Sequence, residues 1–256
     1  MSVLDVKPEL VQFLRSGKLS RRPVTGFLLG LCAHCPSIAE IRFRSYSVSP
    51  NLSRRLELGK ALASTRLASA ERAARDDGIS LWDSLASRVI RRGESLPRQV
   101  FVEALAHQHS EFEKTFVLTR QEILNGGIDS IQDRLGRNDG LAVCSQVRVL
   151  AGYSAHIPML DFACAPTKAN QGAISSMLGV IGQAGVIVNS GNSFHFLGIS
   201  LLTADEWIRF MGQALLLAPF IDARFMAHRL FDGECRLRVF ARNKVPQVPV
   251  IEKCVY

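Results

Sequence analysis

Three polar positions in the second half of the chain stand at the ends of apolar runs and could together support metal-dependent phosphoryl chemistry. Asp161 ends one apolar run and Asp222 follows another. Ser193 and His195 open a third, and because strand side chains alternate, both point to one face. Carboxylates at such positions can hold divalent cations that activate a hydroxyl and stabilise a departing pyrophosphate. A serine and a histidine beside them can bind the phosphates of an incoming nucleotide.

The segments around these positions predict a regular alternation of strands and helices after residue 140. A helix is expected from about Pro166 to Gly185, and a second begins at a capping box over 203–206 and ends at Pro219. The turn residues 190–193 predict a hairpin. Strands are expected at 141–150, 157–163, 186–189, 194–199, 235–240 and 248–255. The order β-α-β-β-α-β predicts an α+β layer with helices on one side of a small sheet, as in the RNA-recognition-motif and ferredoxin-like folds.

The first half of the chain predicts mostly helix. One half-solvated strand is expected over 38–48, because Ile41 and Phe43 alternate with Arg42 and Arg44. Helices are expected at 52–75, 80–92 and 97–124, the last ending at 125–127. The first of these helices carries basic residues that form either a solvated face or a nucleic-acid surface: Arg54, Arg55, Lys60, Arg66, Arg72 and Arg75.

Composition favours a soluble protein with a polyanionic partner. The 256 residues carry a net charge of +8 and a pI of about 9.5, which fits binding to phosphate-rich ligands. The sequence has no 18-residue apolar run and no secretory pattern, so we expect a cytoplasmic protein without membrane contact. Cys32 and Cys35 form the only close cysteine pair, and we expect reduced, partly buried thiols instead of a zinc site.

The ordered set of motifs resembles the archaeo-eukaryotic primase superfamily. That family shows an apolar strand with Asp-x-Asp, then a Ser-x-His strand, then an apolar segment ending in Asp. Here these are LDFA with Asp161, SGNSFH with Ser193 and His195, and PFID with Asp222. The closing segment CRLRVFARNKVPQVPVI is similar to the family's basic Leu-Arg strand. The resemblance covers about residues 141–256.

The resemblance implies an RRM-like primase–polymerase catalytic core over 141–256. The residue pattern before it predicts a mostly helical region over 1–140 with a short strand pair. It implies that Asp161 and Asp222 bind Mg²⁺ or Mn²⁺ and act in catalysis with His195. The implied nucleotide-binding residues are Ser190, Gly191, Ser193, His195, Arg236, Arg238 and Lys244. The implied partners are nucleoside triphosphates and single-stranded or primed nucleic acid, together with other replication, repair or defence proteins.

One departure from the family pattern concerns the metal site. The second carboxylate of the first motif falls on Ala163, which cannot bind a metal. Loss of one ligand from a two-cation site costs several kcal/mol of transition-state stabilisation, since the metals do most of the electrostatic work. Three explanations are open: an inactive family member, a substitute ligand such as Asp139 or Asp205, or an engineered substitution.

Two other functions are therefore kept beside nucleotidyl transfer. The first is a catalytically inactive module of the same fold that binds nucleic acid or nucleotide and works through a partner. The second is an unrelated RNA-recognition-type binder, a class that stacks bases on aromatic residues exposed on its sheet. Phe194 and Phe196 form only one such aromatic pair at strand spacing.

Overall fold

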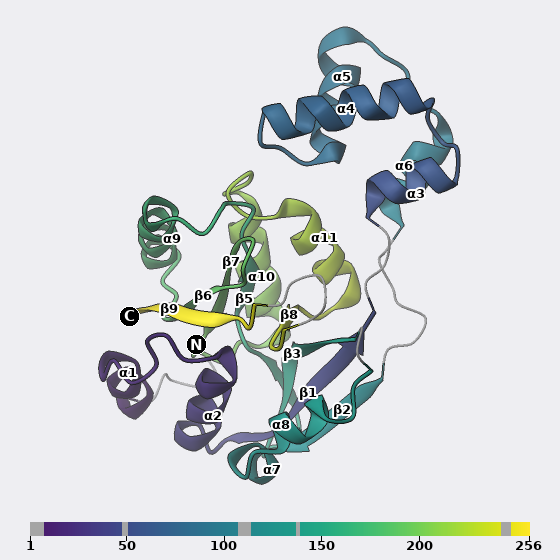
Figure 1. Ribbon diagram of the computed structural model, residues 1–256. Helices are drawn as coiled ribbons and strands as arrows, with labels where there is room; N and C mark the ends of the chain where they lie inside the picture. Colours follow the sequence, from purple (N-terminus) through teal and green to yellow (C-terminus); the bar gives the residue numbers. More distant parts are fainter. Residues whose placement is uncertain (1–7, 48–50, 107–113, 137–138, 242–246) are drawn as a thin grey trace. The chain divides into compact units, whose positions relative to one another are not determined.

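The computed structural model describes residues 8–47, 51–106, 114–136, 139–241 and 247–256 (Figure 1). The chain forms two compact units, one made of residues 1–47 with 112–256 and the other of residues 48–111. Helices and antiparallel strands occur together, which confirms the predicted α+β class. Among the described residues, the helices are too short or too polar to cross a membrane.

A four-stranded antiparallel sheet contains the predicted site strands. Its order is β5-β7-β6-β9, with bounds Met159–Asp161, Phe194–Gly198, Gly185–Asn189 and Val250–Val255. The hairpin of β6 and β7 forms as predicted, and its turn places Gly191 at φ 101°, a conformation that favours glycine. The sequence from β5 to β7 thus follows the predicted strand–helix–hairpin order, while β9 occupies the edge beside β6.

A second antiparallel sheet has the order β2-β1-β3-β4, and β8 also pairs with β3. The bounds of β1 to β4 are Ile38–Tyr46, Thr115–Thr119, Gly140–Val149 and Ser154–His156, and those of β8 are Arg236–Arg238. The predicted alternation of β1 is confirmed, since Ile41 and Phe43 are fully buried. Strands from both sides of residue 140 therefore share one sheet. The single sheet expected after residue 140 is wrong, because its strands divide between two sheets.

The helices of this unit cover the two sheets (Figure 1). They are α1 Pro8–Arg15, α2 Val24–His34, α7 Arg120–Leu124, α8 Gly127–Gln132, α9 Lys168–Val180, α10 Ala204–Leu215 and α11 Ala223–Asp232. The capping box of α10 forms as predicted, with Thr203 and Glu206 bonding each other's backbone amides. Its expected inward face is buried, including Trp207, Phe210 and Met211.

One hydrophobic core lies between the two sheets and these helices. Phe162 and Phe196 are among its largest fully buried side chains, and they directly follow Asp161 and His195 in sequence. Burial of such a side chain stabilises the fold by about 1.5–3 kcal/mol. The core therefore fixes the backbone next to both polar site residues. Cys32 and Cys35 form no disulfide and are buried.

The unit at residues 48–111 contains α3 Leu52–Leu58, α4 Ser64–Asp76, α5 Leu81–Arg92 and α6 Arg98–Leu105. Its separate core includes Leu56, Leu67, Leu85 and Val100. The single helix predicted over 52–75 is wrong, because the chain turns after α3 and Lys60 adopts a positive φ of 48°. Basic residues of these helices pair within the unit: Arg54 with Glu57, Arg55 with Glu103 and Arg66 with Glu94.

The helix predicted over 97–124 is also wrong. Among the described residues of this range, only those of α6 and α7 are helical, and β2 lies between the two helices at Thr115–Thr119. Residues 107–113 lie outside the described residues. The sequence Thr-Phe-Val-Leu-Thr favours a strand, and β1 offers it a pairing partner over Glu40–Arg44. That partner is more than 70 residues away in sequence, so local periodicity could not predict the strand.

Candidate active site

Asp161, His195 and Ser193 meet where β5 and β7 pair. Asp161 is the last residue of β5 and stands directly opposite His195 of β7. His195 Nε2 lies 3.6 Å from Asp161 Oδ1, and Ser193 Oγ donates to the same oxygen at 3.4 Å. The Asp161 side chain is 22% exposed and that of His195 9%. The two motifs are thus joined by contacts that converge on one carboxylate oxygen.

Asp222 lies beside Asp161 because residues 220–222 run along the end of β5. The amide of Asp222 donates to Asp161 O at 3.0 Å, and the amide of Ala163 donates to Phe220 O at 2.9 Å. Asp222 also caps α11, since its Oδ1 accepts from the amide of Phe225 at 2.9 Å. The capping contact uses one carboxylate oxygen and leaves the second available.

Burial and like charge set the protonation of this site. Burial, followed by the charge of Asp222, raises the pKa of Asp161 to about 8. Burial, followed by the charge of Arg238, lowers the pKa of His195 to about 3, so the imidazole is neutral at pH 7. His195 Nδ1 is buried and has no hydrogen-bond partner among the described residues. A cation between the two carboxylates would offset both the cost of burying their charges and the repulsion between them.

The carboxylates of Asp161 and Asp222 are the donors that this site offers to a divalent cation. Ala163 is exposed and supplies only a methyl group at the position of the missing ligand. Within the described ranges, no group of three or more His, Cys, Asp or Glu residues is arranged to hold a metal, so neither Asp139 nor Asp205 completes the site. Mg²⁺ is often held by one or two carboxylates, water and substrate phosphates. Asp161 and Asp222 match that donor set.

The hairpin turn holds two hydroxyl groups, and that of Ser193 contacts Asp161. Ser190 is almost fully buried, and its Oγ donates to Ser193 O at 3.0 Å and lies 3.1 Å from Ser193 Oγ. The amide of Gly191 donates to Asn189 Oδ1 at 2.9 Å, which closes the start of the turn. Ser193 therefore links the turn to Asp161, whereas Ser190 mainly shapes the turn.

The three basic residues predicted to contact phosphate lie in different settings. Arg238 is 8% exposed, and its guanidinium donates to Ser190 O, Phe240 O and Gln247 O. Arg236 pairs with Glu234 and Asp232. Lys244 lies outside the described residues. Neither arginine thus lies on a solvated strand face, and Arg238 binds the backbone of the site hairpin.

Comparison with known families agrees with the motif reading. Residues 121–250, half of the chain, match the family described as archaeo-eukaryotic primase 1D-like, or AEP-like. The chain belongs to the archaeo-eukaryotic primase-like family. The matched region of this AEP-like chain includes Asp161, His195 and Asp222, and it begins at α7, upstream of the predicted start at residue 141. Comparison with curated proteins gives no match, and comparison with solved structures gives none.

Cys164 is a neighbour of the site that the motif pattern does not indicate. Cys164 is partly exposed, and burial followed by the charge of Asp161 raises its pKa. It follows Ala163 directly, but a lone cysteine in a loop gives no signal in sequence. The thiol is protonated at neutral pH and adds no charge to the two carboxylates.

Proposed function

We propose that this chain is a primase–polymerase-type nucleotidyltransferase that acts on nucleic acid with a divalent metal. The observation that supports this best is the contact of Ser193 and His195 with Asp161, beside Asp222. Family membership supports the primase–polymerase fold. Metal use, the nucleic-acid substrate and the roles of individual residues are part of the proposal.

Each residue has one role in this proposal. Asp161 and Asp222 hold Mg²⁺ or Mn²⁺, and the cation supplies Lewis-acid stabilisation of charge on the transferred phosphoryl group. Ser193 Oγ and the neutral His195 imidazole donate hydrogen bonds to phosphate oxygens of the nucleoside triphosphate. Ser190 and Gly191 hold the turn that orients Ser193, and the strand or primer terminus supplies the attacking hydroxyl.

Primer synthesis and extension by the purified protein test this proposal. The assay contains template, nucleoside triphosphates and either Mg²⁺ or Mn²⁺. Ala163→Asp adds the carboxylate that the family pattern has, and we expect it to raise the rate on the order of 100-fold, comparable to the loss of one preorganised electrostatic group. Ala165→Asp is the matched control, because it adds the same charge at an exposed position two residues away.

A second function is favoured by the exposed methyl of Ala163. The chain would then bind nucleotide or nucleic acid without catalysis, and a partner from a replication, repair or defence system would use the complex. Nucleotide binding that persists in EDTA, with no product from either the wild-type chain or Ala163→Asp, would favour this function and reject the first.

A further inference from the structure

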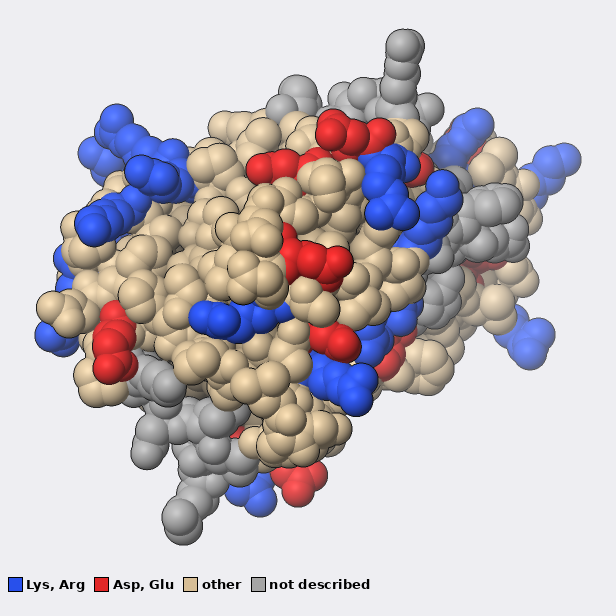
Figure 2. Space-filling model, turned by 90° about the horizontal axis from the view of Figure 1, so that it is seen from below, with Lys and Arg blue, Asp and Glu red and all other residues tan. Residues whose placement is uncertain are grey.

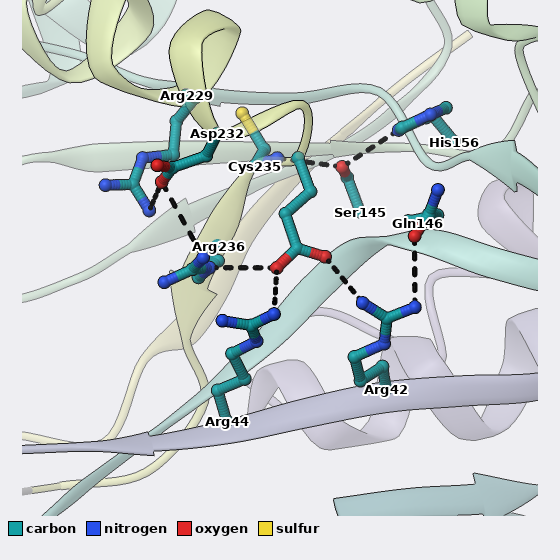
Figure 3. Close-up of polar contacts among 10 residues, drawn as sticks. Arg42, Arg44, Ser145, Gln146, His156, Arg229, Asp232, Cys235 and Arg236 are labelled. Carbon is teal, nitrogen blue, oxygen red and sulfur yellow. Dashed lines mark hydrogen bonds and ion pairs between the residues drawn. The ribbon is translucent and has the colours of Figure 1, made fainter. Parts of the chain in front are cut away.

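A group of arginines surrounds two buried carboxylates where β1, β8 and the end of α11 meet. Figure 3 shows their side chains pointing toward one another. Glu234 Oε1 lies 3.2 Å from Arg44 Nη2 and 3.0 Å from Arg236 Nε, and its Oε2 lies 3.4 Å from Arg42 Nη1. Asp232 pairs with Arg236 and with Arg229, at 3.7 and 3.1 Å. We call Arg42, Arg44, Arg229, Arg236, Asp232 and Glu234 the arginine cluster.

Two members of the arginine cluster reach solvent in fixed orientations. Arg42 and Arg44 stand on the face of β1 opposite the buried Ile41 and Phe43, and their side chains are 34% and 26% exposed. Glu234 holds both guanidinium groups, and Gln146 Oε1 accepts from Arg42 at 3.0 Å. A guanidinium fixed in this way loses little further entropy on binding a phosphate, and its planar fork matches phosphate geometry.

The charge of the arginine cluster is positive. Four arginines and two acids give a formal charge of +2 in one place. On the face drawn in Figure 2, by contrast, Lys and Arg lie in separate groups among uncharged residues and interspersed acids. The total of +8 therefore says little about where a polyanion would bind, whereas the six named members of the arginine cluster together carry an excess of positive charge.

The arginine cluster adjoins the candidate active site through two elements. Helix α11 begins directly after Asp222 and ends at Asp232. Cys235, next to Glu234, contacts Met159 O through its thiol at 3.5 Å, and Met159 precedes Asp161 by two residues on β5. The charges of both Asp161 and Arg229 act on the Cys235 thiol. The arginine cluster is thus connected to the two carboxylates through α11, a helix of ten residues and about 15 Å in length.

We propose that Arg42 and Arg44, oriented by Glu234, bind phosphate groups of the nucleic-acid strand on which this protein acts. This proposal rests on the proposed function in one respect, which is that the bound strand is the template or the primer. The phosphates of a nucleoside triphosphate offer the same chemistry. A purely structural role is the competing explanation, in which the ion pairs only tie β1 to β8.

Binding of a fluorescent single-stranded DNA oligonucleotide, measured in EDTA over a range of salt, tests the proposal. We expect the double change Arg42→Gln with Arg44→Gln to weaken binding roughly 10-fold at low salt and to flatten the log–log salt slope by up to about 1.4, or 0.7 per lost contact. Arg148→Gln is the matched control, because Arg148 is a 63% exposed arginine of β3 in the same sheet. It should bind as the wild type does.

Glu234→Gln separates phosphate binding from a structural role by the sign of its effect. It removes negative charge while Arg42 and Arg44 stay, and the Gln oxygen can still accept a hydrogen bond from one of them. We expect the gain in net positive charge to outweigh the loss of orientation, so binding should be tighter with an unchanged or steeper salt slope, even where urea unfolding shows lower stability. If Glu234→Gln and the double arginine change weaken binding equally, the cluster is structural and the proposal is wrong. Wild-type-like binding by a folded double variant would also overturn it.

A titration with ATP in EDTA distinguishes the two sources of phosphate. If the double variant loses binding of the DNA strand and keeps binding of ATP, the result supports binding of the strand by Arg42 and Arg44. If it loses binding of ATP alone, these arginines bind the triphosphate and the proposal is wrong. No binding of either ligand by the wild-type chain at low salt would overturn both. Because these assays contain no metal and measure no synthesis, they can support phosphate binding by the arginine cluster even if the chain shows no nucleotidyl transfer.

Discussion

At the scale of single residues, the protonation of Asp161 follows from its surroundings. Burial and the nearby Asp222 raise its pKa to about 8, above the value of about 4 in an unfolded chain. The unfolded state therefore loses this proton near pH 4, while the folded state keeps it until near pH 8. Asp161 consequently costs the protein increasing stability as the pH rises between these values.

Asp161→Asn should remove this pH dependence. We expect the variant to gain stability relative to the wild type from pH 4 to pH 8, by on the order of 1–3 kcal/mol because water reaching the side chain reduces the full effect. Urea unfolding across this range measures the difference. Added Mg²⁺ should stabilise the wild type and not the variant. If the free energies of unfolding of the two proteins change in parallel from pH 4 to pH 8, the pKa of Asp161 is not raised in the folded state and this prediction is wrong.

At the scale of elements, Arg238 holds the site hairpin in place. Its guanidinium joins Ser190 O of the turn to Phe240 O and Gln247 O, which follow β8 and precede β9. Three backbone carbonyls thus depend on one buried side chain. Arg238 acts in this account as a positioning residue, even though the family resemblance assigned it to phosphate.

Arg238→Met should loosen the hairpin and leave its strands paired. Unsatisfied buried carbonyls cost about 1–3 kcal/mol each, so we expect a stability loss of roughly 2–4 kcal/mol after partial rehydration. Hydrogen exchange should quicken at residues 190–195. The pKa of His195 should rise, because the charge of Arg238 lowers it. Arg148→Met is the exposed control, and equal exchange in the two variants would reject the positioning role.

At the scale of the whole molecule, the two compact units have separate cores. Leu56, Leu67, Leu85 and Val100 form one, and none of them belongs to the core that anchors Asp161 and His195. We expect Leu85→Ala to destabilise residues 48–111 by about 2–5 kcal/mol. Amides of β6 and β7 should keep their exchange protection. Loss of protection in both units together would show that they unfold as one.

Much of the site region could be predicted from sequence because its signals are local. The Ser190–Ser193 turn, the capping box at Thr203 and alternating apolar residues each depend on neighbours within a few positions. The site motifs stand at element ends, where pairing of β5 with β7 brings Asp161 and His195 together. Local pattern and tertiary structure agree there.

The remaining features depend on partners that are far away in sequence. Strand β2 forms because β1 pairs with it, and helical periodicity over 97–124 conceals it. Arg42 meets Glu234 across 192 positions, so the arginine cluster has no sequence signature. The burial of Arg238 is equally non-local, since basic residues on a short strand normally predict a solvated face. The chain's division into units likewise follows strand pairing instead of composition.

The most direct test of the central claim is a crystal structure with Mn²⁺ and a non-hydrolysable nucleoside triphosphate. If Asp161 and Asp222 hold the metal, an anomalous peak will lie within about 2.0–2.6 Å of carboxylate oxygens of both residues. Phosphate oxygens will also lie within hydrogen-bond distance of Ser193 Oγ and His195. A nucleotide bound elsewhere, or manganese absent from these two carboxylates while the nucleotide is bound, would contradict the account.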